Sequence, residues 1–550
     1  MKSIILTLIT LAFTSSQILG QNIQFDWNNI IGSSGNNIAK SIISDENGYL
    51  YVAGEFYGDL ILGDSVVTGL ADRNIFIFKL DLDGNLIWSR SLGSNTPISL
   101  GQICFDTSMN IVCTGTFSNT LLLNDTTITS NGGTDIFLLK VKNTGETISI
   151  NSDGGIGDEN SNSLCVNKNN DLYICGGFSG TSSFGDITMT SYGYWQYTPW
   201  GDYVYIDVQN AFFAKYDSQN NCIFAKQVTE NRSDLYSILT DSDNNIYTTG
   251  YFSGYDAITD TVAQEVGEFL VFKYNQNGEF VNLIQEGSDN NYIKGKSLAI
   301  DNEDNLYISG YIGCHNCMFG DSLIPDSHND AFLVKYNSQG DMDWINLIGQ
   351  YHGDYDGNEN SGNSIVIDKN NDVILTGYFD GIELNGEIIL GNGIRLDILL
   401  MKFNQNGEII TIGKYGYPSW DKGESITIDS SNNIYIVGIT YLNNMSSDLP
   451  SYIFIAKVDT VYPLLNIDIN TLDQVNIYPN PSSGLFNIDL PSNFNQKATI
   501  IVCNVEGKIL FTSNVTQKHN EILLQGIKPG LYLVKILIKD KIYFKKLLIQ

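Results

Sequence analysis

Basic residues are scarce in this sequence. Its 550 residues include 30 Lys and Arg against 61 Asp and Glu, which gives a formal net charge of -31 at pH 7. Affinity for nucleic acids and for anionic lipid headgroups comes largely from Lys and Arg that neutralise negative charge. A surface this acidic repels both, so we expect no nucleic-acid partner.

Long apolar runs are also missing, and a helix needs about 20 apolar residues to cross a bilayer. The apolar run at residues 4–13 is about half that long, follows Lys2 and precedes a plausible cleavage site after Gly20. Residues 1–20 are therefore predicted to be a secretory signal peptide. It contains no Cys, so we expect no lipid anchor. No later stretch is both long and charge-free enough to span a bilayer, so we expect no transmembrane helix.

Familiar catalytic motifs are absent as well. There are only 4 His, and the sequence contains no Gly-rich phosphate loop, G-x-S-x-G turn or HExxH motif. Glycosidase-type carboxylate pairs remain possible among 61 acidic residues, but the sequence assigns none of them. The catalytic residues, if there are any, are unknown from the sequence.

What is present is a repeat. A hydrophobic run that ends in glycine recurs at steps of 61, 61, 74, 60, 67 and 61 residues, at Gly54, Gly115, Gly176, Gly250, Gly310, Gly377 and Gly438. Before the glycine lies an S-h-x-h-D run, as in the run ending at Asp45, with QICFD and SLCVN as variants. After it comes a strand-like run with a fixed lysine, at Lys79, Lys140, Lys215, Lys273, Lys335, Lys402 and Lys457.

Each unit supplies four short runs rich in β-branched and aromatic residues, separated by turn sequences. One four-stranded antiparallel sheet per unit predicts an all-β, seven-bladed β-propeller over residues 21–459. The seventh unit lacks its fourth run, whereas residues 25–31 carry the Trp27 to Gly32 spacing of that run. We therefore expect the N-terminal strand to complete the last blade and close the ring.

With its hYhhG, hFhhKhD and G-x-hhW elements, the segment 25–459 resembles the bacterial β-propeller repeats often called SBBP. That resemblance implies a β-propeller architecture but indicates little about activity, because one fold hosts many functions.

The composition changes near residue 475. Residues 475–550 contain 9 Lys and 4 acidic residues, and their alternating strands and turns predict a small β-sandwich after a linker at 460–474. This domain resembles the type A sorting domain of the type IX secretion system of Bacteroidetes. The matching positions are Tyr478, Pro479, Asn480, Pro481, Gly484, Gly507, Gly530, Leu531, Tyr532, Lys545 and Lys546. The resemblance implies Sec export, passage through the outer membrane with the type IX machinery as a partner, and removal of the domain, followed by release or surface attachment.

The longest interruption of the repeat is rich in aromatic residues. The 74-residue step holds SYGYWQYTPWGDYVYIDVQN, with Tyr192, Tyr194, Trp195, Tyr197, Trp200, Tyr203 and Tyr205. The connections between second and third strands, and those between units, all lie at the same end of each antiparallel sheet. Binding residues commonly lie on such loops. These aromatic side chains have two interpretations. They form an exposed shelf that binds sugar rings or a protein partner, or they pack as a cluster over the blade edge.

A second loop region suggests a metal. It holds Cys314, His315, Cys317, Asp326, His328, Asp330, His352, Asp354 and Asp356. Cys, His and carboxylate are the usual zinc ligands, and Asp354 to Asn358 weakly resembles a calcium loop without its closing Glu. Zinc or calcium is one interpretation, and a Cys314 to Cys317 disulfide with solvated neighbours is the other. The pairing of Cys104 with Cys113, and of Cys165 with Cys175, stays open.

Two functions follow from the sequence. The first is an exported, non-catalytic protein that binds glycan or protein through its long-loop face, and the sequence favours it. The second is an extracellular glycosidase or lyase with carboxylates near the axis. Convergent acids of raised pKa in the central opening would favour the enzyme, whereas an aromatic shelf without them would favour binding.

Overall fold

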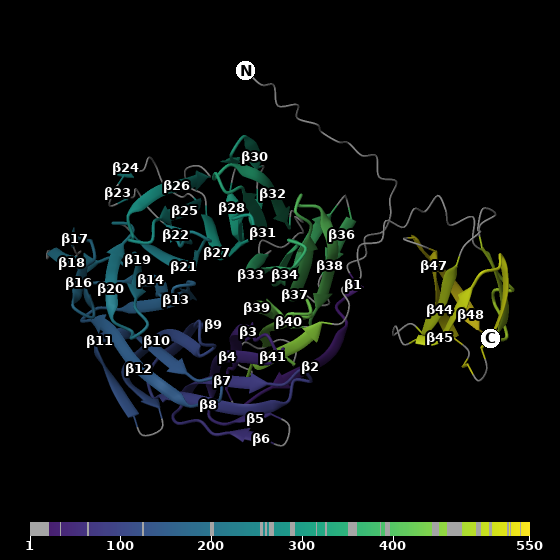
Figure 1. The fold of residues 1–550 in the computed structure, drawn as a ribbon, viewed down its shortest axis with the longest axis horizontal. Coiled ribbons are helices and arrows are strands. Elements are labelled where there is room, and N and C mark those ends of the chain that lie inside the picture. The colour runs from purple at the N-terminus through teal and green to yellow at the C-terminus, as the bar shows by residue number, and fades with distance from the viewer. Residues whose placement is uncertain are drawn as a thin grey trace. The chain divides into compact units, whose positions relative to one another are not determined.

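The chain divides into two compact units, one over Leu19–Val461 and one that includes Tyr462–Gln550. Both are built from β-strands in the described residues (Figure 1). The computed structural model describes residues 21–33, 35–62, 65–123, 126–197, 203–230, 232–252, 257–258, 261–262, 269–286, 292–314, 316–324, 327–349, 360–384, 387–390, 396–417, 419–442, 450–458, 476–490, 497–504, 509–524, 527–528, 530–538 and 541–549.

The larger unit repeats one arrangement, four successive antiparallel strands. The first two repeats are joined into one ten-stranded sheet, in which Gly93 pairs with Leu122. The first two repeats contain β3 (Ile38–Ser44), β4 (Leu50–Tyr57), β7 (Arg73–Leu80) and β8 (Leu86–Ser94), then β9 (Ile98–Phe105), β10 (Ile111–Leu123), β11 (Thr126–Val141) and β12 (Thr147–Gly155). The third and fourth contain β13 (Glu159–Val166), β14 (Leu172–Phe178), β19 (Asn210–Tyr216) and β20 (Cys222–Gln227), then β21 (Ser233–Thr240), β22 (Ile246–Phe252), β25 (Phe269–Tyr274) and β26 (Phe280–Glu286). The fifth and sixth contain β27 (Tyr292–Ile300), β28 (Leu306–Cys314), β31 (Ser327–Tyr336) and β32 (Met342–Ile348), then β33 (Ser361–Ile367), β34 (Val373–Phe379), β37 (Asp397–Phe403) and β38 (Ile409–Tyr415).

The last repeat takes one strand from the other end of the sequence. Its own strands are β39 (Lys422–Ile428), β40 (Ile434–Thr440) and β41 (Tyr452–Val458), and β2 (Phe25–Ile31) pairs antiparallel with β41. The preceding β1 (Gln21–Asn22) pairs in parallel with β38 of the sixth repeat, a contact that the sequence analysis did not predict. The segment 21–31 therefore joins the last two repeats.

The first strand of each repeat contacts the first strands of its two neighbours. These contacts run from β3 to β9, β13, β21, β27, β33 and β39, and from β39 back to β3. In Figure 1 the sheets follow one another around a common centre.

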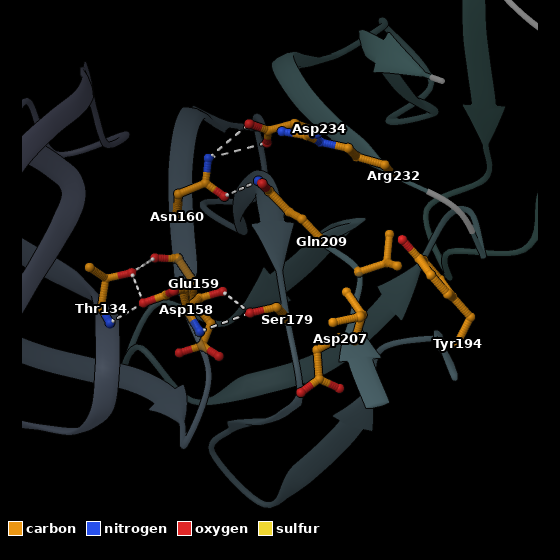
Figure 2. Close-up of a pocket in the computed structure, with 12 residues that line it drawn as sticks. Thr134, Asp158, Glu159, Asn160, Ser179, Tyr194, Asp207, Gln209, Arg232 and Asp234 are labelled. Carbon is orange, nitrogen blue, oxygen red and sulfur yellow. Dashed lines mark hydrogen bonds between the residues drawn. The ribbon is translucent and has the colours of Figure 1, made fainter. Parts of the chain in front are cut away.

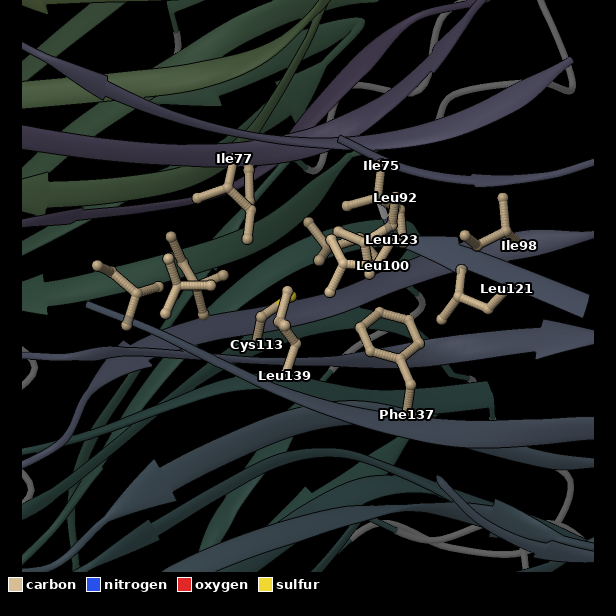
Figure 3. Close-up of a cluster of buried hydrophobic side chains, with 14 of the residues drawn as sticks. Ile75, Ile77, Leu92, Ile98, Leu100, Cys113, Leu121, Leu123, Phe137 and Leu139 are labelled. Atoms are coloured by element: carbon tan, nitrogen blue, oxygen red, sulfur yellow. The ribbon is translucent and has the colours of Figure 1, made fainter. Parts of the chain in front are cut away.

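Each sheet buries both faces against its neighbours. Between the first two repeats, Ile75 and Ile77 of β7 pack in one cluster with Cys113, Phe137 and Leu139 of β10 and β11 (Figure 3). The second and third strands are therefore buried almost without alternation, because both sides of such a strand face a core. Along β4, for example, six of the eight residues are buried.

The recurring glycine has a steric cause. The first strand of each repeat carries a bulge opposite the glycine, for example between Ala39 and Ser41 opposite Gly54. A Cβ on Gly54 would lie 2.0 Å from the carbonyl oxygen of Ile38, and one on Gly310 would lie 1.8 Å from that of Lys294. No side chain fits there, which explains why the glycine is kept in every repeat.

In three repeats the fixed lysine contacts the S-h-x-h-D aspartate, and in three others it pairs with another aspartate: Asp171, Asp343 or Asp26. Lys140 lies 2.6 Å from Asp106, Lys402 lies 2.7 Å from Asp368, and Lys273 lies 3.6 Å from Asp241. The aspartate also accepts hydrogen bonds from the turn that follows it; Asp106 accepts the backbone N–H groups two and four residues on. The turn acids therefore serve the scaffold.

These contacts predict a pH-dependent stability. Burial raises the pKa of Asp106, but hydrogen bonds from Asn110 and Lys140 outweigh it and hold the pKa below its usual value. A depressed folded-state pKa stabilises the fold above the unfolded pKa of about 4, and this contribution is lost as the pH falls through the folded value. Asp106→Asn should lower the free energy of unfolding at pH 7 by about 1–3 kcal/mol.

In denaturant unfolding at pH 7, 5 and 3, the gap between Asp106→Asn and the wild type should narrow as the pH falls. Asp83→Asn, at an exposed turn position, is the matched control. A gap that stays constant at every pH would show that the ionised form of Asp106 does not stabilise the fold.

The two ends of the sheets differ. Turns between the first and second strands and between the third and fourth strands are short and form the turn face; the other connections form the loop face. Several second-to-third connections contain extra hairpins that the sequence analysis did not resolve. They are β5 (Leu60–Leu62) with β6 (Ser65–Val67), β15 (Thr181–Phe184) with β16 (Ile187–Thr190), β17 (Gly193–Tyr197) with β18 (Tyr203–Asp207), β23 (Ala257–Ile258) with β24 (Thr261–Val262), β29 (Cys317–Phe319) with β30 (Ser322–Ile324), and β35 (Gly381–Leu384) with β36 (Glu387–Leu390).

The smaller unit contains two antiparallel sheets. One is β42 (Asn476–Tyr478), β43 (Leu485–Asp489) and β46 (His519–Leu523), and the other is β45 (Ile509–Val515), β44 (Ala498–Asn504), β47 (Gly530–Ile538) and β48 (Lys541–Ile549). Side chains from both sheets, including Phe486, Ile500, Val534 and Leu547, form one buried cluster. This unit therefore has its own core.

Candidate ligand-binding face

The aromatic insertion forms a hairpin of its own, made by β17 and β18 and called the aromatic hairpin below. The register pairs Trp195 with Tyr205 and Tyr197 with Tyr203. Six of the seven predicted aromatic residues are described, and each exposes at least 44 % of its surface: Tyr192, Tyr194, Trp195, Tyr197, Tyr203 and Tyr205. Trp200 lies outside the described residues. The described rings are thus not packed down over the sheet edge.

Backbone contacts hold the base of the aromatic hairpin. Ser191 and Gly180 exchange two hydrogen bonds, from Ser191 N to Gly180 O and from Gly180 N to Ser191 Oγ, both 2.8 Å. Tyr192 N donates to Asn210 Oδ1 at 2.7 Å, and Val208 N donates to Tyr192 O at 3.0 Å. The hairpin is therefore fixed to the third repeat at its N-terminal end, and its two ends are bonded to each other.

The hairpin has two different sides. On one side, the rings of Trp195 and Tyr205 have centroids 5.3 Å apart, and those of Tyr197 and Tyr203 are 5.1 Å apart. Successive residues of a strand point to opposite sides, so Tyr194 lies on the other side from Trp195. Tyr194 lines a cavity beside the hairpin, and the hairpin thus offers a row of ring pairs outward and one tyrosine to the cavity.

This cavity, called the polar cavity below, has a volume of about 740 Å³ (Figure 2). Its lining comes from the loop-face ends of the second, third and fourth repeats, and includes Thr134, Asp158, Glu159, Asn160, Ser179, Tyr194, Asp207, Gln209, Arg232 and Asp234. Carboxylates and amides dominate this wall. The cavity therefore offers many hydrogen-bond acceptors and few positive charges.

Asp234 is the centre of a hydrogen-bond network in the polar cavity. Asn160 Nδ2 donates to both its oxygens at 3.2 and 3.0 Å, and Asn162 Nδ2 donates to Oδ1 at 2.8 Å. Gln209 Nε2 in turn donates to Asn160 Oδ1 at 3.2 Å. The network thus holds side chains of β13, of β21 and of the residue before β19 in fixed orientations.

Two acids of the cavity have raised pKa values. Burial raises the pKa of Asp234 to about 6, although hydrogen bonds from Asn160, Asn162 and Gln209 and the charge of Lys294 lower it. Burial also raises the pKa of Glu159 to about 7 against hydrogen bonds from Ser182 and Gly155 N. The oxygens of both carboxylates already accept hydrogen bonds from protein donors. This arrangement suits orienting neighbouring side chains better than transferring a proton to or from a ligand.

A second group of residues lies on the same face, and the sequence analysis missed it. It combines three lysines of the first strands with three tyrosines that each follow a motif glycine, namely Lys294, Lys296, Lys422, Tyr251, Tyr311 and Tyr378. This is the lysine–tyrosine cluster. The signal was present in the sequence, because YTTGYF, YISGYI and ILTGYF repeat the tyrosine, but no single repeat contains the whole cluster.

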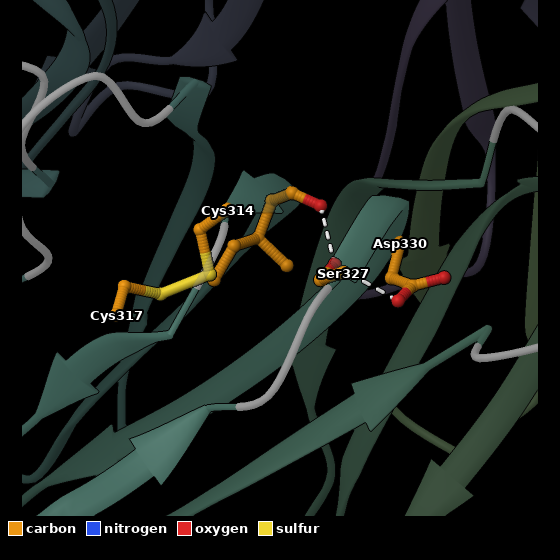
Figure 4. Close-up of a disulfide and its surroundings, with 5 residues drawn as sticks. Cys314, Cys317, Ser327 and Asp330 are labelled. Carbon is orange, nitrogen blue, oxygen red and sulfur yellow. Dashed lines mark hydrogen bonds between the residues drawn. A yellow bond between two sulfur atoms is a disulfide. The ribbon is translucent and has the colours of Figure 1, made fainter.

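The structure describes only part of the predicted metal region. Cys314 and Cys317 form a disulfide (Figure 4), so in this form neither sulfur is a thiolate ligand. Asp330 accepts a hydrogen bond from Ser327 Oγ at 2.9 Å. His328 lies in β31, but its side chain is not described, and His315, Asp326, His352, Asp354 and Asp356 lie outside the described residues. Among the described residues, no group of three His, Cys, Asp or Glu is placed to hold a metal ion.

The cysteine pairs left open by the sequence are not bonded. Cys104, Cys113, Cys165 and Cys175 are free thiols, and Cys104 is opposite Val112 rather than Cys113 in the sheet. Burial raises the pKa of each of these thiols well above its usual value, so they behave as core side chains.

Several of the predicted sorting residues make hydrogen bonds within the smaller unit. Asn480 Oδ1 accepts a hydrogen bond from Leu548 N at 2.8 Å. Tyr478 Oη donates to Asp489 Oδ1 and Tyr532 Oη donates to Lys528 O, at 3.2 and 2.7 Å.

The other sorting positions have backbone roles or are not described. Gly484 adopts a φ of +103°, which favours glycine. Pro479 and Pro481 lie between β42 and β43, and Gly530 begins β47. Lys545 and Lys546 pair with Val534 and Leu533 through β48, but their side chains are not described, and Gly507 lies outside the described residues.

Comparison with protein families identifies the role of this smaller unit. Residues 476–550 match the family described as a secretion system C-terminal sorting domain. The protein is therefore exported by type IX secretion, to the cell surface or the medium, and the secretion machinery is its partner during export. In the described part of the chain there is no helix long and apolar enough to cross a membrane.

The chain also has distant similarities to other known proteins. Over 251 residues the chain is 24 % identical to an uncharacterized WD repeat-containing protein, L264, of Acanthamoeba polyphaga mimivirus, a match that covers 36 % of this chain and 18 % of that protein. The chain thus spans about a fifth of that relative's length.

Two solved structures illustrate the structural similarity. A fungal AA5-family alcohol oxidase in complex with copper has a TM-score of 0.38 at 10 % identity, over 96 % of this chain and 100 % of that one. A PL25 ulvan lyase has a TM-score of 0.38 at 9 % identity, over 80 % and 99 %. Similarity at this level carries no argument about activity.

Proposed function

We propose that the exported protein is a non-catalytic carbohydrate-binding protein that uses its loop face. The observation that carries this proposal is the aromatic hairpin, which holds exposed, paired rings beside the polar cavity. Monomeric soluble proteins seldom expose large apolar side chains together unless the patch has a binding role.

The chemistry of the site suits a sugar. A sugar ring has an apolar face of C–H groups, which stacks on tyrosine and tryptophan, and a rim of hydroxyl groups, which needs fixed donors and acceptors. The hairpin offers the rings, and the Asp234, Asn160 and Gln209 network offers pre-oriented acceptors and donors. A protein ligand could use the rings, but it would leave this cavity of about 740 Å³ largely unfilled.

We also propose that the repeats close into a seven-bladed β-propeller, with residues 25–31 as the outer strand of the last blade. The pairing of β2 with β41 supports it, as does the cycle of first-strand contacts that returns from β39 to β3. In this arrangement residues 21–459 form the propeller, 460–474 the linker and 475–550 the sorting domain, after a signal peptide at 1–20. The propeller would present the loop face as a rigid platform.

A polymer-cleaving enzyme is the second candidate, because Asp234 and Glu159 line one cavity with pKa values raised to about 6 and about 7. Such a pair would be correctly protonated only between those pH values and would give a bell-shaped rate profile. Hydrolysis or elimination of any bound glycan with an optimum at pH 6–7, abolished by Asp234→Asn, would establish the enzyme. Bound glycan recovered intact would establish the binding protein.

Ring removal tests the binding proposal. In a glycan array with residues 21–461, Trp195→Ala and Tyr197→Ala should each weaken binding by about 1–3 kcal/mol, by analogy with bases stacked on aromatic side chains. Both side chains are more than half exposed, so the free energy of unfolding should change by less than about 0.5 kcal/mol.

The control variants separate stacking from other effects. Trp195→Phe and Tyr197→Phe keep a ring and should retain most of the affinity, and Ile223→Ala removes an exposed apolar side chain of the same repeat outside the hairpin. If the alanine variants bind glycan as the wild type does, or are strongly destabilised, the hairpin is not the binding surface.

A further inference from the structure

The lysine–tyrosine cluster is a local concentration of positive charge in a strongly acidic chain. The net charge of the chain is -31, yet Lys294, Lys296 and Lys422 share neighbouring tyrosine rings. Lys294 Nζ lies 4.6 Å from the ring centroid of Tyr251 and 5.6 Å from that of Tyr311. The cluster continues to the sixth and seventh repeats.

The same pattern links the remaining cations. Lys296 Nζ lies 5.9 Å from the centroid of Tyr311 and 5.6 Å from that of Tyr378, and Lys422 Nζ lies 4.2 Å from that of Tyr378. Cations and rings therefore alternate across the first and second strands of four successive repeats. Ring faces attract the ammonium groups without neutralising their charge.

The carboxylates that the structure describes near the cluster are differently engaged. Glu424 lies close enough to Lys296 and Lys422 for their charges to lower its pKa, but burial dominates and raises it. Asp234 feels Lys294 and is bonded to the amides of Asn160 and Asn162. Among the ion pairs that the structure describes, none involves Lys294 or Lys422.

The cluster is continuous with the polar cavity. Asp234 of the cavity is directly opposite Tyr251 of the cluster in the sheet. Arg232 lines the cavity, and its charge and that of Lys294 both act on the Tyr292 hydroxyl. The six residues of the cluster are half-buried. Tyr292 and Trp420, which lie beside Lys294 and Lys422, are 46 % and 39 % exposed, so solvent reaches the edges of the cluster.

We propose that the lysine–tyrosine cluster binds the anionic group, a carboxylate or a sulfate ester, of an acidic sugar whose neutral part rests on the aromatic hairpin and in the polar cavity. This inference rests on the proposed carbohydrate-binding function and names the class of glycan. Ammonium groups spaced along a row of tyrosine rings, as Lys294, Lys296 and Lys422 are, suit such an anion. The acidic surface around them repels long polyanions, which selects a short or sparsely charged acidic glycan.

The experiment uses two matched pairs of probes with residues 21–461. Trigalacturonate and its neutral methyl ester test the carboxylate, and lactose sulfate and lactose test the sulfate ester. By calorimetry, Lys294→Gln with Lys422→Gln should weaken binding of the charged probe at least about ten-fold and leave the neutral probe unchanged. Lys294→Arg with Lys422→Arg should keep the affinity, and Lys142→Gln, on a turn-face turn, should have no effect.

The outcomes separate this inference from the function on which it rests. Binding of one charged probe alone supports it and identifies the anion. Equal affinity for charged and neutral probes, or unchanged binding by the glutamine variants, overturns it while the carbohydrate-binding proposal stands. Failure to bind either charged probe also overturns it, and the glycan array with the hairpin variants then judges the proposed function separately. If the double variant unfolds, Lys422→Gln alone is measured in the same way.

Discussion

Deleting residues 21–32 should leave a larger unit that aggregates and no longer unfolds in one cooperative transition. The deletion removes β2 and leaves β41 as an unpaired strand edge, which is a site for pairing with other chains. It also removes the Lys457 to Asp26 ion pair at 2.7 Å and the hydrogen bond from Trp27 Nε1 to Leu82 O at 2.9 Å. Size-exclusion chromatography and thermal unfolding of residues 33–461 and 21–461 measure the effect.

A shorter deletion is the matched control. Removing residues 21–24 takes away β1 and its parallel pairing with β38 but keeps β2. This variant should remain monomeric with a modestly lower melting temperature. If residues 33–461 are as monomeric and as stable as residues 21–461, the N-terminal strand does not close the ring.

Removing residues 476–550 should abolish delivery to the cell surface or medium, because these residues match the sorting-domain family. The truncated protein should accumulate in the periplasm, still folded, since the larger unit has its own clusters of buried side chains. Cell fractionation in the native host, followed by limited proteolysis of each fraction, measures both parts of the prediction.

A point variant controls for loss of the whole domain. Val534→Asp places a charge in the core of the smaller unit and should block export as the truncation does, because an uncompensated buried charge strongly destabilises a fold. Normal surface delivery of the truncated chain would contradict the export role of this domain.

The repeat could be read from the sequence because its signals are local. The motif glycine is required by a bulge in the neighbouring strand of its own repeat. The fixed lysine contacts an aspartate of its own repeat, as Lys140 contacts Asp106 and Lys402 contacts Asp368. The pairing of residues 25–31 with the last repeat was also predictable, because the Trp27 to Gly32 spacing recurs in other repeats. In contrast, β1 consists of two residues with no pattern, so its parallel pairing left no trace in the sequence.

The candidate site was only partly predictable. The density of Tyr and Trp marked the aromatic hairpin, but composition could not decide between a shelf and a packed cluster; the exposure of Trp195 and Tyr203, 66 % and 68 %, is a property of the fold. The lysine–tyrosine cluster was missed because Tyr251 and Lys422 belong to repeats that are distant in sequence. The metal hypothesis at Cys314 and Cys317 gave way to the disulfide alternative, since sequence spacing alone cannot separate the two.

The central claim is that the loop face binds carbohydrate, and hydrogen exchange with a bound glycan tests it most directly. With the best glycan from the array at saturation, amides of residues 193–197, 203–210 and 232–236 should exchange more slowly than in the free protein. The turn-face turns, such as residues 81–85 and 142–146, should be unaffected. Protection confined to the turn face, or no protection of the aromatic hairpin by any glycan that binds, would contradict the account.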